Sequence, residues 1–288
     1  PMNGSNASNA FYTIYSLPRS MDIRDFSDPR TADGNMRWYG EGSQTNPYWA
    51  SKYNLNSDTR DRFLLSAALK YKVTDWLDAE LRVGSDQYAT RVERKTYAGS
   101  PIAKGGGQYE TEQVKFYENN YSFLISAHKD NLFDKLGASG SFGGNLMERR
   151  LTGLRAWVDQ LVIKNIFSLN NGLERPKNME TFSHKKINSL YGTLQLNWDG
   201  YLFLDGTLRN DWSSSLAKAN RSFLYPSLSV SVVLSDLLRK GNVRLPEWIS
   251  FAKLRASMAQ VGNDLEPYQL YSTYNIKKDP LGGTIASV

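Results

Sequence analysis

The sequence predicts an all-β fold, an antiparallel transmembrane β-barrel segment of about eight strands with long extracellular loops. Three features of the 288-residue chain point to this fold. Segments in which apolar and polar residues alternate recur along the chain, as expected for strands with two different faces. The connections between them alternate between short and long, as in outer-membrane barrels. Tryptophans gather beside the short connections, which is typical of an aromatic girdle at a membrane interface.

The clearest strand runs from Phe223 to Leu234, where apolar residues alternate with serines. Its apolar face is suited to lipid and its polar face to water. We expect a lipid-facing set, Leu228, Val230, Leu81 and Leu254, and a lumen-facing set, Ser229, Arg82 and Arg255. Pro226 cannot donate to a strand ladder, so we place it near a bulge or the outer rim. The predicted strands are 62–72, 76–97, 112–128, 133–148, 186–198, 201–213, 222–234 and 249–262.

The connections within successive pairs of strands all fall on one side of the sheet. They are Val73–Asp75, Lys129–Leu132, Asp199-Gly200 and the longer Ser235–Trp248. Asp199-Gly200 predicts a type I′ hairpin turn, because glycine tolerates a positive φ. The connections on the other side, Ala98–Thr111, Arg149–Lys185 and Ser214–Arg221, are longer than the first three of these. Short helices are predicted near Leu154–Ile166 and Asp236–Lys240.

Aromatic residues lie beside the short connections, namely Trp76, Trp198, Tyr201, Trp248 and Phe251. An indole settles at the headgroup level of a membrane, so these positions suggest a girdle. Tryptophans also cap hydrophobic cores near hairpins in other β-proteins. A soluble β-sandwich, such as a carbohydrate-binding module, would show the same alternation and stays open as the alternative.

The composition and short motifs argue against several classes of structure and function. No apolar run approaches the roughly 18 residues of a transmembrane helix. The absence of cysteine removes disulfides and thiolate chemistry. The net charge is +6, but the basic residues are scattered among acidic ones, so no nucleic-acid partner is expected. Gly105-Gly106-Gly107 lacks the lysine and hydroxyl residue of a phosphate-binding loop and is interpreted as a loop tip.

The organisation follows from the strand count. We expect an extracellular arm over 1–61, membrane strands with short periplasmic turns over 62–262, and an extracellular loop over 263–288. Both ends of the chain then lie on the long-loop side, whereas complete bacterial barrels start and finish in the periplasm. The chain is therefore expected to be an internal segment of a larger barrel.

Several short sequence motifs resemble those of the SusC/RagA family of TonB-dependent outer-membrane transporters of the Bacteroidetes. These motifs are Met21–Phe26, Asn46–Trp49, Arg60–Phe63, Thr74–Leu77, Arg209–Ser214, Tyr225–Ser231, Lys253–Ser257 and Gln260–Asp264. The resemblance covers nearly the whole chain through their order and spacing. The sequence departs from the family pattern at Val233 and Met258-Ala259.

The resemblance implies a barrel of about 22 strands, of which this chain would supply about eight. It also implies import of oligosaccharides or oligopeptides with a SusD-like surface lipoprotein. TonB would act through a plug region that these residues do not contain. The sequence does not distinguish a glycan from a peptide substrate.

No catalytic or metal site is predicted, and no cofactor is assigned. The two histidines, His128 and His184, stand away from any nucleophile-elbow pattern. Asp22 and Asp25 could supply paired carboxylates, but an Arg24 ion pair that pins a loop is the preferred interpretation. Trp38, Tyr39, Tyr48 and Trp49 are candidate ligand-binding residues, because loop aromatics stack on sugar rings or apolar side chains. Anchoring of the loop is the alternative role for these rings.

Overall fold

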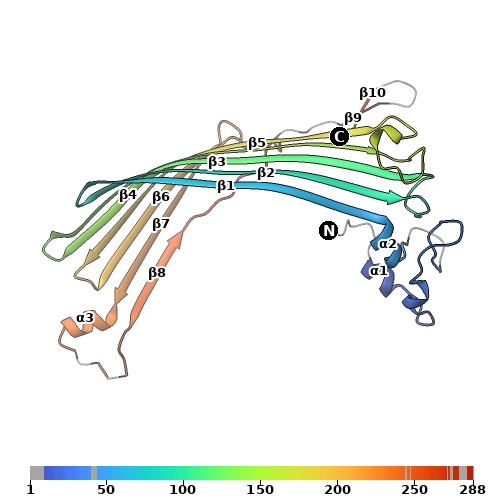
Figure 1. The fold of residues 1–288 in the computed structure, drawn as a ribbon. Coiled ribbons are helices and arrows are strands. Elements are labelled where there is room, and N and C mark those ends of the chain that lie inside the picture. The colour runs from blue at the N-terminus through green and yellow to red at the C-terminus, as the bar shows by residue number, and fades with distance from the viewer. Residues whose placement is uncertain are drawn as a thin grey trace. The chain divides into compact units, whose positions relative to one another are not determined.

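The computed structural model describes residues 10–39, 44–243, 245–246, 248–270, 272, 275–278 and 284–287. Its main element is one eight-stranded sheet in which every strand lies beside its neighbours in the sequence (Figure 1). The strands are β1 (Asn54–Thr74), β2 (Leu77–Tyr97), β3 (Gly107–Phe133), β4 (Leu136–Val158), β5 (Lys177–Trp198), β6 (Leu202–Ser213), β7 (Ser222–Val233) and β8 (Lys253–Ala259). The predicted all-β fold of eight antiparallel strands is thereby confirmed.

The remaining elements are short. They are α1 (Ala10–Tyr15), η2 (Ile23–Phe26), α2 (Pro47–Tyr53), η3 (Leu169–Asn171), α3 (Leu234–Lys240), β9 (Asn275–Lys278) and β10 (Thr284–Ser287). The strands β9 and β10 form a separate two-stranded sheet within the segment predicted as the loop 263–288, part of which lies outside the described residues. Among the described residues, no helix has both the length and the apolar character needed to cross a bilayer.

Helix α3 confirms the helix predicted near Asp236–Lys240. The helix predicted over Leu154–Ile166 is wrong, because β4 continues to Val158 and the next residues are irregular. Here Arg155 and Trp157 alternate with the buried Val158, which is a strand period, and pairing with the neighbouring strands overrides local helix propensity. The predicted turn at Lys129–Leu132 is also displaced, since β3 runs to Phe133.

Contacts divide the chain into two compact units. Unit 1 comprises the described residues within Pro1–Arg62, Gln87–Phe116 and Leu151–Phe182. Unit 2 comprises those within Phe63–Asp86, Tyr117–Arg150 and Ser183–Val288. Strands β1 to β5 contribute residues to both units.

In unit 2, the register of β5 to β8 places like residues in rows across the sheet. One row joins Leu196, Leu204, Val230 and Ala256, and the next joins Gln195, Asp205, Ser229 and Ser257. Side chains opposite one another in paired strands project from the same face. The sheet therefore has one leucine-rich face and one polar face.

The leucine-rich face is open. Leu208, Leu224 and Leu228 keep 51%, 53% and 55% of their surface exposed. A soluble β-sandwich would cover this face with a second sheet, and the described residues contain no second sheet beyond the β9–β10 pair. The described residues therefore form a single-layer sheet rather than a two-sheet sandwich.

The hairpin between β5 and β6 turns at Asp199 and Gly200, with φ values of 52° and 75°. Both values lie in the left-handed region, as the predicted type I′ turn requires. The Asp199 carboxylate holds the Lys240 ammonium of α3 at 2.6 Å. The connection from β7 to β8 is thereby fastened to a neighbouring hairpin.

Pro226 occupies a strand position opposite Leu208, and its carbonyl accepts a hydrogen bond from the Gln260 amide at 3.0 Å. The N–H and C=O groups of a strand residue point to the same neighbour, so the N–H that proline lacks would have faced the β8 side. Strand β8 ends at Ala259, opposite Ser227. The proline therefore falls where the β7–β8 ladder stops, and the sheet tolerates it there.

Unit 1 contains a small buried core at the ends of β3 and β4. Tyr109, Val158 and Leu161 are at most 7% exposed, and Phe167 and Leu169 pack against them. The loop tip at Gly105–Gly107 lies on this core, since the Leu161 amide donates to the Gly107 carbonyl at 2.9 Å. A side chain at the tip would collide with the β4–β5 connection.

We expect Gly106→Ala to destabilise unit 1. The added methyl group would lie 2.0 Å from the Leu161 carbonyl oxygen, so the backbone must move, at a cost of about 1–3 kcal/mol. Gly206→Ala is the matched control, because nothing lies within 4 Å of its added methyl group. Denaturant unfolding of both variants measures the difference, and equal midpoints would contradict the packing described.

Candidate functional site

The polar face of unit 2 is a network of paired side chains. Gln195 donates to Asp205 at 2.7 Å, and the Thr207 and Ser227 hydroxyls lie 2.5 Å apart. Nearer the long connections, Arg209 pairs with Asp211 at 2.8 Å and donates to Ser189 at 3.0 Å. Such a surface offers many hydrogen-bonding groups to water or to a polar solute.

Aromatic rings join this network towards the long connections. The Arg209 guanidinium lies 5.9 Å from the centre of the Tyr191 ring. On β7, the Phe223 and Tyr225 rings are stacked with their centres 6.5 Å apart. Rings beside charged and amide groups can contact both the apolar and the polar parts of a solute.

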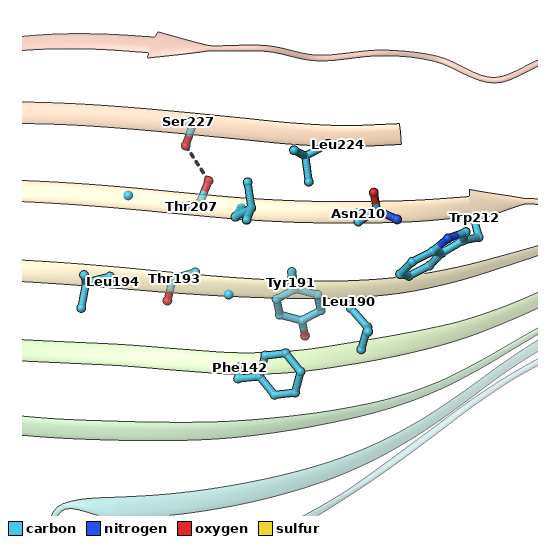
Figure 2. A pocket seen from close by; sticks show the side chains of 13 residues that line it. Phe142, Leu190, Tyr191, Thr193, Leu194, Thr207, Asn210, Trp212, Leu224 and Ser227 are labelled. Carbon is cyan, nitrogen blue, oxygen red and sulfur yellow. Dashed lines mark hydrogen bonds between the residues drawn. The ribbon is translucent and has the colours of Figure 1, made fainter. Parts of the chain in front are cut away.

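The hollow in Figure 2 has a different character. It measures about 620 Å³ and lies where Gly192 and Gly206 leave gaps on the leucine-rich face. Its walls include Phe142, Leu190 and Leu224, and few polar atoms line it. Because its exposed lining is mostly apolar, the hollow suits hydrocarbon rather than a polar solute.

A buried ion pair holds the segment after β8. The Lys185 ammonium lies 2.7 Å from the Asp264 carboxylate, and their side chains are 8% and 15% exposed. Ser213 and Ser215 donate to the second carboxylate oxygen at 2.6 and 3.2 Å. Burial raises the pKa of Asp264, but the hydrogen bonds from Lys185 and Ser213 outweigh it and hold the pKa below its usual range.

The four candidate aromatics lie in unit 1 in two separate clusters. The Trp38 and Tyr39 ring centres are 4.9 Å apart, and the Tyr39 hydroxyl donates to Ser16 at 3.3 Å. Trp49 is 1% exposed and packs on Tyr53 at 4.3 Å. Tyr48 is half-buried beside Trp49 in α2. Trp49 therefore anchors the arm, and ligand contact by the four residues stays a prediction.

Asp22 and Arg24 form the ion pair expected from the sequence. The Arg24 Nε donates to the Asp22 carboxylate at 2.9 Å, and Asp22 also caps η2. Hydrogen bonds from the Arg24 side chain and backbone lower the pKa of Asp22 to about 2. With its carboxylate so engaged, Asp22 is a poor candidate for acid–base chemistry.

Unit 1 contains a cluster of charged side chains that the sequence pattern did not predict. Arg155 donates to Glu110 at 2.6 Å, and Arg94 pairs with the same carboxylate. The Arg155 guanidinium also lies 5.1 Å from the centre of the Trp157 ring. The assignment of 154–166 as a helix hid this arrangement, although charged and aromatic residues alternate with apolar ones there.

The two histidines lie apart. The His184 Nε2 is 2.7 Å from the Glu148 carboxylate, whereas the His128 amide donates to the Trp76 carbonyl at 2.9 Å. Within the described ranges, no group of three or more His, Cys, Asp or Glu residues is arranged to hold a metal ion.

We expect Lys185→Met to loosen the segment 260–270. The change leaves the Asp264 carboxylate buried without its cation, at a cost of about 2–5 kcal/mol. Lys186→Met is the control, because the Lys186 side chain is 54% exposed and lies 3.3 Å from Glu148. Amide hydrogen exchange over 260–270 reports the difference, and similar exchange in both variants would contradict the role of the buried pair.

The same ion pair should respond to acid. Since the folded-state pKa of Asp264 is depressed, its contribution is present above the unfolded-state pKa of about 4 and is lost as the pH falls through the lower folded value. Protection of 260–270 should stay constant from about pH 7 to 5 and fall only below about pH 4. Asp264→Asn should lack this acid step, and a loss of protection above about pH 5 would contradict the assignment.

No protein-family model and no curated protein matches the chain. Solved structures do match. A chain of the RagAB peptide transporter has a TM-score of 0.76 at 17% identity, covering 90% of this chain and 30% of its own length. The "closed-closed" and "open-open" states of the RagAB peptide importer give TM-scores of 0.74 and 0.69 at 17% and 18% identity, each covering 90% of this chain and 29% of the matched chain.

The chain thus spans less than a third of the length of the transporter chains that it matches. The similarity covers 90% of this chain at low sequence identity, so it establishes the fold alone. The predicted resemblance to a SusC/RagA-type barrel segment is confirmed at that level.

Proposed function

We propose that this chain forms part of the wall and outer mouth of a TonB-dependent outer-membrane importer. The observation that carries the proposal is the single sheet with one exposed leucine-rich face and one polar, hydrogen-bonded face. A bilayer supplies the two environments that such a sheet needs. The similarity in fold to RagAB transporter chains supports transport rather than catalysis.

In this proposal, residues 62–262 carry the membrane strands, and residues 1–61 and 263–288 lie outside the cell. The short turns face the periplasm, with Trp76, Trp198 and Trp248 as the girdle beside them. These indoles are 53%, 44% and 82% exposed, which supports contact with the lipid headgroups. TonB would act through a plug that these residues do not contain.

The substrate is an oligopeptide or an oligosaccharide, captured with a SusD-like surface lipoprotein. The matched solved structures are described as a peptide transporter, which favours peptides as the first substrates to test. The arm around Trp38, Tyr39, Tyr48 and Trp49 would border the capture surface. The buried Trp49 would hold the backbone of this surface in place, while the half-buried Tyr48 would be accessible to the solute or the lipoprotein.

Uptake tests the function directly. A strain lacking the protein that carries this chain should lose uptake of labelled oligopeptides, and the restored gene should return it only when TonB is active. Labelled oligosaccharides form the second arm and decide the substrate class. Unchanged uptake of both classes in the deletion strain would contradict the proposal.

The assignment of the faces gives a matched pair of variants. Val230→Arg should cost about 2–4 kcal/mol near the bilayer midplane, because it places a charge in lipid. Ser229→Arg should be mild, since the adjacent residue projects from the polar face. Folding titrations into lipid vesicles measure both changes in the free energy of unfolding. Equal losses of stability would contradict the assignment of the leucine-rich face to lipid.

The arm is tested by Trp49→Ala and Tyr48→Ala, each compared in stability and in uptake. Trp49→Ala should lower stability, by about 3–5 kcal/mol for a fully buried ring. Tyr48→Ala should lower solute or lipoprotein affinity with a smaller effect on folding. Wild-type affinity in correctly folded variants of all four aromatics would remove the arm from the capture surface.

A further inference from the structure

A small polar pocket lies in unit 1 between the β2–β3 loop, the end of β4 and the start of β5. Its volume is about 220 Å³. The residues that matter for its chemistry are Lys104, Trp157, Asp159, Glu174, Arg175 and Lys177. Polar atoms form most of its lining, unlike the hollow on the leucine-rich face.

The pocket carries an excess of positive charge. Lys177 pairs with Asp159, which neutralises both groups. Among the described residues, no hydrogen bond or ion pair engages the exposed side chains of Lys104 and Arg175, and Glu174 is the remaining acidic residue of the lining. The guanidinium of arginine presents paired N–H groups that match a carboxylate. The unpaired charge therefore favours an anionic group.

The acidic residues of the lining further restrict the chemistry of the ligand that the pocket can bind. A bare anion would face repulsion from the exposed carboxylate of Glu174. A carboxylate that carries neighbouring N–H or O–H groups would satisfy the acidic residues of the lining, because carboxylates accept hydrogen bonds from such donors. Trp157 adds an apolar wall beside the charged groups.

The backbone around the pocket is held in place although it belongs to long connections. The Leu173 amide donates to the Gln160 carbonyl at 2.9 Å, and the Asn165 amide donates to the Gly106 carbonyl at 3.1 Å. The side chain of Asn171 donates to two carbonyls of the same connection at 2.8 Å each. The backbone of the pocket is therefore preformed, and binding would mainly have to order the exposed side chains of Lys104 and Arg175.

We propose that this pocket is a carboxylate-binding subsite of the importer, which recognises an acidic group flanked by hydrogen-bond donors. The inference rests on the proposed function and specifies the chemistry of its solute. The C-terminus of a peptide and a uronic acid both present this chemistry. Lys104 and Arg175 bind the carboxylate, and Asp159 and Glu174 accept from the neighbouring donors.

Binding to the complete protein in detergent tests the subsite. The probes are N-acetyl-trialanine, its C-terminal amide, methyl glucuronide and methyl glucoside. We expect at least one acid to bind about tenfold more tightly than its neutral counterpart, a difference of about 1.4 kcal/mol. The acid that shows the preference identifies the source of the carboxylate.

The double variant Lys104→Gln/Arg175→Gln should bind acid and neutral probes equally. Lys164→Gln is the matched control, since Lys164 is exposed in the same connection but does not line the pocket. It should keep the preference, and thermal unfolding should show that both variants are folded. Equal or absent binding of acid and neutral probes by the wild type, or a preserved preference in the double variant, would overturn the subsite.

These outcomes are separate from those of the uptake test. If the deletion strain showed unchanged uptake but the protein still preferred acid probes, the transport proposal would be contradicted and the carboxylate site would stand. If uptake depended on the protein but no probe showed an acid preference, the carboxylate site would be contradicted and the transport proposal would stand.

Discussion

The structure depends on one constraint, the alternation of side chains along strands that form a single layer. A sheet in a soluble domain hides its apolar face against a second layer. Here the row of Leu204 and Val230 has no such cover among the described residues, while Asp205 in the adjacent row accepts a hydrogen bond from Gln195. The two faces therefore suit two different environments, which is the condition that the proposed membrane wall would meet.

The long connections depend on other contacts, because most of their backbone is irregular and lies outside the strand ladders. A small core around Val158 and Leu161 fixes the β4–β5 connection, and the Lys185–Asp264 pair fixes the segment after β8. Both contacts join residues far apart in the sequence. The backbone that carries residues such as Arg175 is thereby held in place although it is irregular.

Much of the sheet could be predicted from the sequence, since period-2 patterns such as Leu224–Leu234 and the Asp199-Gly200 turn act locally. The extent of β4 and the site around Trp157 could not, because strand pairing and burial of Val158 decided them. The candidate aromatics were found by residue type alone. Composition does not distinguish the buried Trp49 from the more open Tyr48, since that difference arises from packing on Tyr53.

The most direct measurement uses the absence of cysteine from this chain. Single cysteines placed in turn at positions 227 to 231 of β7 can carry a fluorescent label in a lipid bilayer. We expect lipid-borne quenchers to reach the even positions, including Leu228 and Val230, and water-soluble quenchers to reach the odd ones, including Ser229. Quenching from water at every position, or no alternation between the two quenchers, would contradict the division of the sheet between lipid and water.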